Sequence, residues 1–104
     1  MASDSCAPLA EGEILNGAHS EWPLFEVTIH GSARERLKLS KRLLCAVKHL
    51  PLRLHIRYEK STEKSVEYGV AKDPTLEMGG RFLAEGLVSA EELEARFQAL
   101  RVEG

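Results

Sequence analysis

Apolar and polar residues alternate in two stretches of the first half of the chain. In residues 24–30 (LFEVTIH) and in residues 52–58 (LRLHIRY), every second residue is apolar. This two-residue period is typical of a strand that buries one face. The two stretches therefore predict two strands, and the polar side of the second carries Arg53, His55 and Arg57.

The apolar spacing changes to that of a helix between these strands. A helix is predicted over residues 33–50, ended by Pro51, because its apolar residues fall on one arc. That arc comprises Leu37, Leu39, Leu43, Leu44, Ala46, Val47 and Leu50. A short helix is predicted over residues 62–68, with Gly69 suited to its C-terminal cap. Ser89 and Glu92 form a capping box that opens a last helix.

Residues 74–84 (PTLEMGGRFLA) predict a hairpin with a two-glycine turn. The predicted order is β-α-β-α-β-β-α, an α/β fold with a four-stranded mixed sheet and helices on both faces. Residues 1–22 lack either period and predict a flexible N-terminal extension, with a short strand or helical turn near residues 13–16 as an exception. In that exception, Ile14-Leu15 would dock on the sheet edge or on a neighbouring subunit. The folded domain is predicted to span residues 23–104, entered at Trp22-Pro23.

Composition limits the classes of function. The 104 residues carry 14 Lys and Arg against 16 Asp and Glu, for a net charge of −2, which argues against nucleic acid as a partner. No apolar run reaches the roughly 20 residues of a membrane span, so no membrane association is expected. Two cysteines do not make a disulfide scaffold. The N-terminal sequence is acidic and lacks a secretion signal, so a cytoplasmic location is expected.

Residues 69–86 (GVAKDPTLEMGGRFLAEG) and 87–93 (LVSAEEL) carry a resemblance to a known family. They resemble small thioredoxin-like proteins of the redox-active disulfide type, which share a G-V-x-x-x-P-[TA]-[LV] segment before a hairpin. The resemblance implies a thioredoxin-like fold over most of the chain beyond the N-terminal extension. It also implies a cis Asp73–Pro74 bond and an edge, beside the Pro74 loop, that receives an extended polypeptide.

The chain departs from this family where the family's chemistry is located. Family members carry C-x-x-C at the start of the first helix, where one thiolate attacks a disulfide. The aligned positions here are Ser32 and Glu35, or Ala33 and Arg36, depending on a one-residue shift. A serine hydroxyl does not replace a thiolate in this exchange, so the family's redox activity is expected to be absent.

A few other residues are candidates for chemistry. Cys45 is the candidate for a reactive thiol, although mid-helix it lacks the N-terminal dipole that favours a thiolate, and Cys6 is expected to be an idle thiol. The four histidines have no zinc-ligand spacing, so no metal is predicted. His30 lies near Ser32, but no third group completes a catalytic triad. The positive charges at the start of the first helix suit a solvated face, or an anion site.

The leading hypothesis is a redox-inactive thioredoxin-like domain that binds or regulates through a protein or peptide partner, with no cofactor, and enzymatic activity is not expected. The predicted binding residues are Gly31, Ser32, Ala33, Arg34, Glu35, Asp73, Pro74 and Thr75. The alternatives are a divergent thiol-dependent oxidoreductase that uses Cys45 and a small protein that binds an anion or ligand. A homodimer is left open.

Overall fold

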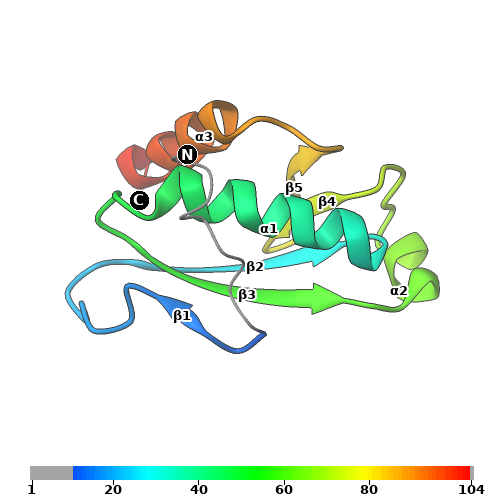
Figure 1. Cartoon of the computed structure of the whole chain (residues 1–104), viewed down its shortest axis with the longest axis horizontal. Helices are drawn as coiled ribbons and strands as arrows, with labels where there is room; N and C mark the ends of the chain where they lie inside the picture. The colour runs from blue at the N-terminus through cyan, green and yellow to red at the C-terminus, as the bar shows by residue number, and fades with distance from the viewer. Residues whose placement is uncertain (1–10, 104) are drawn as a thin grey trace.

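The computed structural model describes residues 11–103. These residues form one five-stranded mixed sheet and three helices in the order β-β-α-β-α-β-β-α (Figure 1). The strands are β1 (Ile14–Leu15), β2 (Leu24–His30), β3 (Arg53–Glu59), β4 (Thr75–Met78) and β5 (Arg81–Glu85). The helices are α1 (Ala33–Val47), α2 (Thr62–Glu67) and α3 (Ala90–Glu103).

The sheet has the strand order β1-β3-β2-β4-β5. Strands β2 and β3 are parallel and are connected through α1, whereas β4 is antiparallel to β2 and forms a hairpin with β5. The hairpin turns at Gly79 and Gly80, which both have positive φ. The predicted hairpin and parallel pair are therefore confirmed, as is the cis Asp73–Pro74 peptide bond.

Alternation along β2 divides its side chains between the two faces of the sheet. Phe25 faces α3, where its ring meets the ring of Phe97 edge-on at 6.0 Å. The core on this side is formed by α1, α3 and the sheet, and Val27 and Ile29 are fully buried in it. The His30 side chain lies on the opposite face of the sheet, where it contacts Ser65 of α2. Helices α1 and α3 thus cover one face, and α2 covers one end of the other.

Two sequence predictions are corrected in detail. The sheet has five strands instead of four, because β1 pairs antiparallel with the edge of β3. Half-buried Leu15 packs against the core, and the Asn16 side-chain amide donates to the carbonyl of Leu52 at 3.0 Å. Leu37 is 48% exposed instead of core-facing, because the buried stripe of α1 is narrower than the predicted arc. Residues 1–10 lie outside the described residues.

Glu11 connects the segment before β1 to β3, and this contact predicts a dependence on pH. The Tyr58 amide donates to Glu11 at 3.4 Å, and Lys60 lies 3.4 Å from the same carboxylate. The hydrogen bond from Tyr58 and then the charge of Lys60 hold the pKa of Glu11 below its usual value. The contact is therefore present at neutral pH and is lost as the pH falls through this lowered pKa.

We expect the Tyr58 amide resonance to titrate with a midpoint below that of a glutamate in an unstructured peptide. An NMR titration of the ¹⁵N-labelled protein measures this midpoint directly. The control variant Glu11→Gln should remove the titration. A midpoint at or above the peptide value would contradict the contact.

Candidate functional site

The two loops predicted to form one binding edge are in direct contact. The backbone amide of Ser32 donates to Asp73 Oδ1 at 3.0 Å, across 41 residues of sequence. Gly31 has a φ of +137°, and a Cβ at this position would overlap Asp73 Oδ1 and lie 3.1 Å from Pro74 Cα. Glycine is therefore required by both backbone conformation and space. The approach joins the end of β2 to the segment before β4.

Local interactions hold this edge in place. Arg36, half-buried in the first turn of α1, donates to the Gly31 carbonyl at 2.6 Å. Thr75 is buried, pairs with His30 in the sheet, and donates through Oγ1 to the Lys72 carbonyl at 2.7 Å. Pro74 is also buried. The loop before β4 is therefore fixed at its carboxyl end by the sheet.

Asp73 presents backbone polar groups at this edge. The residue is exposed and lies outside the strands, and its amide and carbonyl make no backbone–backbone hydrogen bond with another described residue. Such groups are satisfied by water or by a ligand. The side chains of Ala33 and Arg34 are exposed as well, whereas half-buried Glu35 lies 3.5 Å from Lys38.

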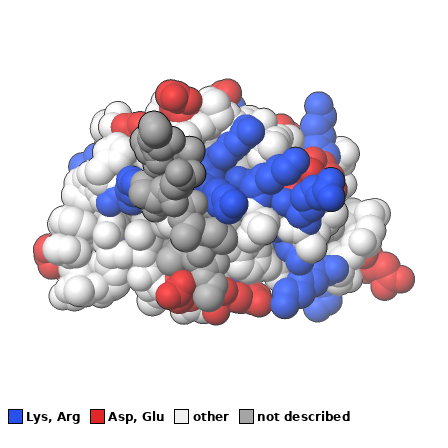
Figure 2. All heavy atoms as spheres, viewed as in Figure 1, with Lys and Arg blue, Asp and Glu red and all other residues white. Residues whose placement is uncertain are grey.

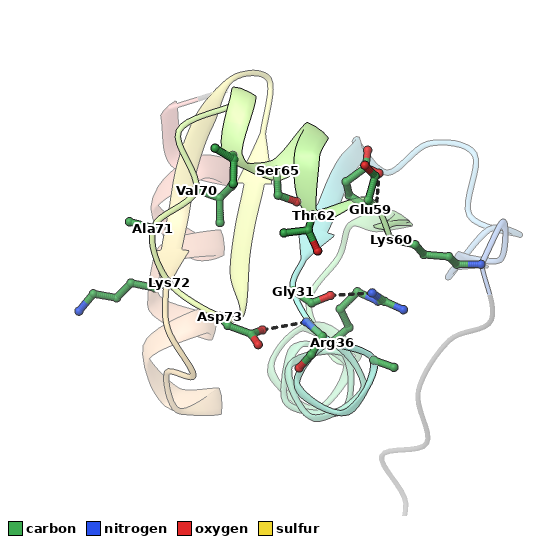
Figure 3. Close-up of a pocket in the computed structure, with 14 residues that line it drawn as sticks. Gly31, Arg36, Glu59, Lys60, Thr62, Ser65, Val70, Ala71, Lys72 and Asp73 are labelled. Atoms are coloured by element: carbon green, nitrogen blue, oxygen red, sulfur yellow. Dashed lines mark hydrogen bonds between the residues drawn. The ribbon is translucent and has the colours of Figure 1, made fainter.

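A cavity of about 550 Å³ opens beside these loops (Figure 3). Four of the predicted binding residues line it, namely Gly31, Ser32, Ala33 and Asp73, but Arg34, Glu35, Pro74 and Thr75 do not. The remaining wall consists of Arg36, the β3–α2 connection, α2 and the segment that follows α2. Figure 3 shows Thr62 and Ser65 across the cavity from Gly31, Arg36 and Asp73. This volume is sufficient for a small molecule or a few side chains.

Helix α2 forms one wall of the cavity, and residues next to it in the sequence determine where it begins and ends. Ser61 caps it by accepting a hydrogen bond from the Lys64 amide at 3.2 Å. Gly69, at a φ of +89°, follows its C-terminal end. The Val70 amide then donates to the Ser65 carbonyl at 3.0 Å, which turns the chain back along the cavity. The predicted short helix and its glycine cap are confirmed.

Positive charge borders the site. Figure 2 shows Lys and Arg side chains gathered on the face that α1 covers. Arg34, Lys38, Lys41 and Arg42 are exposed there, and Lys60 and Lys72 line the cavity. The charged helix face predicted from sequence is thus next to the cavity, and its field favours negatively charged groups nearby.

A buried polar network below the cavity was missed by sequence analysis. His30 is fully buried, with Nδ1 at 2.8 Å from Ser65 Oγ and Nε2 at 2.9 Å from Glu77 Oε1. The sequence drew attention to His30 through its neighbour Ser32, but the hydroxyl that His30 contacts comes from α2. The only sequence signal was a polar residue at the end of an otherwise buried strand.

Cys45, the candidate reactive thiol, is half-buried and disulfide-bonded, so it is not a free thiol. Cys6 and the prediction made for it lie outside the described residues. Among residues 11–103, no group of three or more His, Cys, Asp or Glu side chains is placed to hold a metal ion. No helix in the same part of the chain is long and apolar enough to cross a membrane.

No protein-family model matches the chain, and neither curated proteins nor solved structures give a statistically significant match.

Proposed function

We propose that this chain is a thioredoxin-like domain without redox activity that binds an extended segment of a protein partner. The binding edge consists of the Gly31–Ser32 turn and Asp73. The observation that carries the proposal is that the exposed residue Asp73 has an amide and a carbonyl with no backbone partner among the described residues, beside a cavity of about 550 Å³. An extended peptide satisfies such groups by strand addition.

The topology supports the thioredoxin-like assignment. A parallel β2-α1-β3 unit is followed by α2, a β4–β5 hairpin and α3, which is the order that the sequence resemblance implies. Strand β1 is an addition at the edge of β3. The C-x-x-C position of the family falls at the start of α1, beside the Pro74 loop, where this chain has Ser32 and Glu35 or Ala33 and Arg36.

Thiol–disulfide exchange is expected to be absent. Turnover needs a surface thiolate and a second thiol that resolves the mixed disulfide, and the loop beside Pro74 contains neither. In an insulin-reduction assay with dithiothreitol, the protein should not exceed the rate of dithiothreitol alone. Turnover that the Cys45→Ser variant abolishes would contradict this expectation and favour a thiol-dependent enzyme.

Peptide selection tests the binding function itself. A phage-displayed library of linear peptides is selected on the folded protein, and the enriched peptides are synthesised with a single N-methyl group at each position in turn. The Asp73 carbonyl accepts one peptide amide, so N-methylation should weaken binding at one position of each peptide, by about tenfold for the hydrogen bond lost. Uniform tolerance of N-methylation, or no enrichment of any peptide, would contradict the proposal.

A further inference from the structure

Three side chains from three separate elements form a continuous hydrogen-bonded chain. Ser65 of α2 contacts His30 of β2 at 2.8 Å, and His30 contacts Glu77 of β4 at 2.9 Å. The imidazole is fully buried, and the Tyr68 ring lies edge-on to it with 5.7 Å between ring centroids. Ser65 is 8% exposed and lines the cavity. Of the three hydrogen-bonded side chains, Ser65 therefore lies nearest to a ligand in the cavity.

The direction of the hydrogen bonds follows from their acceptors. A carboxylate only accepts, so the His30 Nε2 carries the proton that Glu77 Oε1 receives. In the neutral imidazole the other nitrogen, Nδ1, then has a free electron pair and accepts a hydrogen bond from the Ser65 hydroxyl. Glu77 is itself held, because its Oε2 accepts from the Gly80 amide at 3.1 Å. A hydroxyl, a base and a group that orients the base are the parts of an activated nucleophile.

Backbone amides and apolar side chains also line the cavity. Ala33 lines it at the amino end of α1, where first-turn amides have no partner within the helix. The N-cap residue Ser32 makes no side-chain capping hydrogen bond to these amides. Such amides favour a negatively charged group in the cavity. Val66, Val70 and Ala71 line the cavity as apolar groups of modest size, which suits a short acyl chain.

We propose that this cavity is an acyl-transfer site that hydrolyses small carboxylic esters with a short apolar acyl group. Ser65 Oγ attacks the ester carbonyl carbon while its proton passes to His30 Nδ1. The carbon–oxygen bond to the alcohol breaks, and His30 returns the proton to the leaving alcohol. Water then attacks the acyl-Ser65 ester with His30 as base, which releases the carboxylic acid and restores the Ser65 hydroxyl. Glu77 acts as a positioning residue.

Covalent labelling tests the nucleophile without knowledge of the natural substrate. The folded protein is treated with an alkyl fluorophosphonate, and the site of modification is mapped by mass spectrometry. We expect one adduct on Ser65, together with hydrolysis of p-nitrophenyl butyrate that the adduct blocks. Ser65→Ala should remove both signals. Ser40→Ala is the matched control, because Ser40 is equally a buried serine, hydrogen-bonded to Tyr58 at 2.8 Å, outside the cavity lining.

A second measurement, the rate of Ser65 labelling, tests the role of Glu77. Glu77→Gln should slow labelling of Ser65 by about 100-fold or more, because the imidazole is then held in the wrong tautomer. Wild-type protein that stays unlabelled, or labelling as fast in Glu77→Gln as in wild type, would overturn the proposal and leave the network a purely structural link between α2 and the sheet. The peptide-binding function is measured separately, so either proposal can fail without the other.

Discussion

Replacement of Phe97 by alanine should lower the free energy of unfolding by about 3–5 kcal/mol. Phe97 of α3 is fully buried and is among the largest side chains of the core. Its ring meets Phe25 of β2, so it joins the last helix to the sheet. A domain of this size has a total stability of about 5–15 kcal/mol, and the substitution therefore removes a large part of it. Urea denaturation followed by circular dichroism measures the change.

The matched control for this substitution is Val102→Ala. Val102 lies in the same helix but is 87% exposed, so its truncation should change the stability by less than about 0.5 kcal/mol. A loss below about 1 kcal/mol for Phe97→Ala would show that α3 does not pack on the sheet as described.

Alanine at Gly31 should damage the candidate site, whereas alanine at Gly79 should not. Both glycines have positive φ, but the space at Gly79 is open, while a Cβ at Gly31 would overlap the Asp73 carboxylate. Gly79→Ala should therefore cost only the backbone penalty of about 1–2 kcal/mol. Gly31→Ala adds an overpacking cost of about 1–3 kcal/mol and displaces Asp73 from Ser32.

Thermal unfolding and peptide affinity distinguish these two variants. The Gly31→Ala protein should melt lower than Gly79→Ala and should lose affinity for the selected peptides, while Gly79→Ala binds them like the wild type. Equal melting temperatures together with equal affinities would contradict the close approach of the two loops.

The sequence was informative about local structure because its signals are local. Alternation over residues 24–30 and 52–58 predicted β2 and β3, and Gly79-Gly80 predicted the hairpin turn. The Ser89 hydroxyl accepts from the Glu92 amide at 3.1 Å, which confirms one half of the predicted capping box at the start of α3. The Glu92 carboxylate instead accepts from Arg96 at 2.7 Å. Each of these features depends on residues that lie within a few positions of each other in the sequence.

The parts that sequence analysis missed depend on contacts between distant residues. Docking of Ile14-Leu15 on the sheet edge was one of the expectations, and β1 does pair with the edge of β3. Its strand partner and register were not predicted, because β3 lies about 40 positions away and two apolar residues have no period. The His30 network joins residues 35 and 47 positions apart. The approach of residues 31–32 to Asp73 was expected only through the resemblance, because no local pattern specifies it.

The most direct test of peptide binding is an NMR titration of the ¹⁵N-labelled protein with a peptide from the selection. The proposal predicts the largest amide shifts at Gly31, Ser32 and Asp73, together with slower hydrogen exchange of the Asp73 amide when the peptide is bound. Amides of β5, on the far side of β4, should change little. Shifts centred on β5 or β1, with the Asp73 amide unchanged, would contradict the proposal.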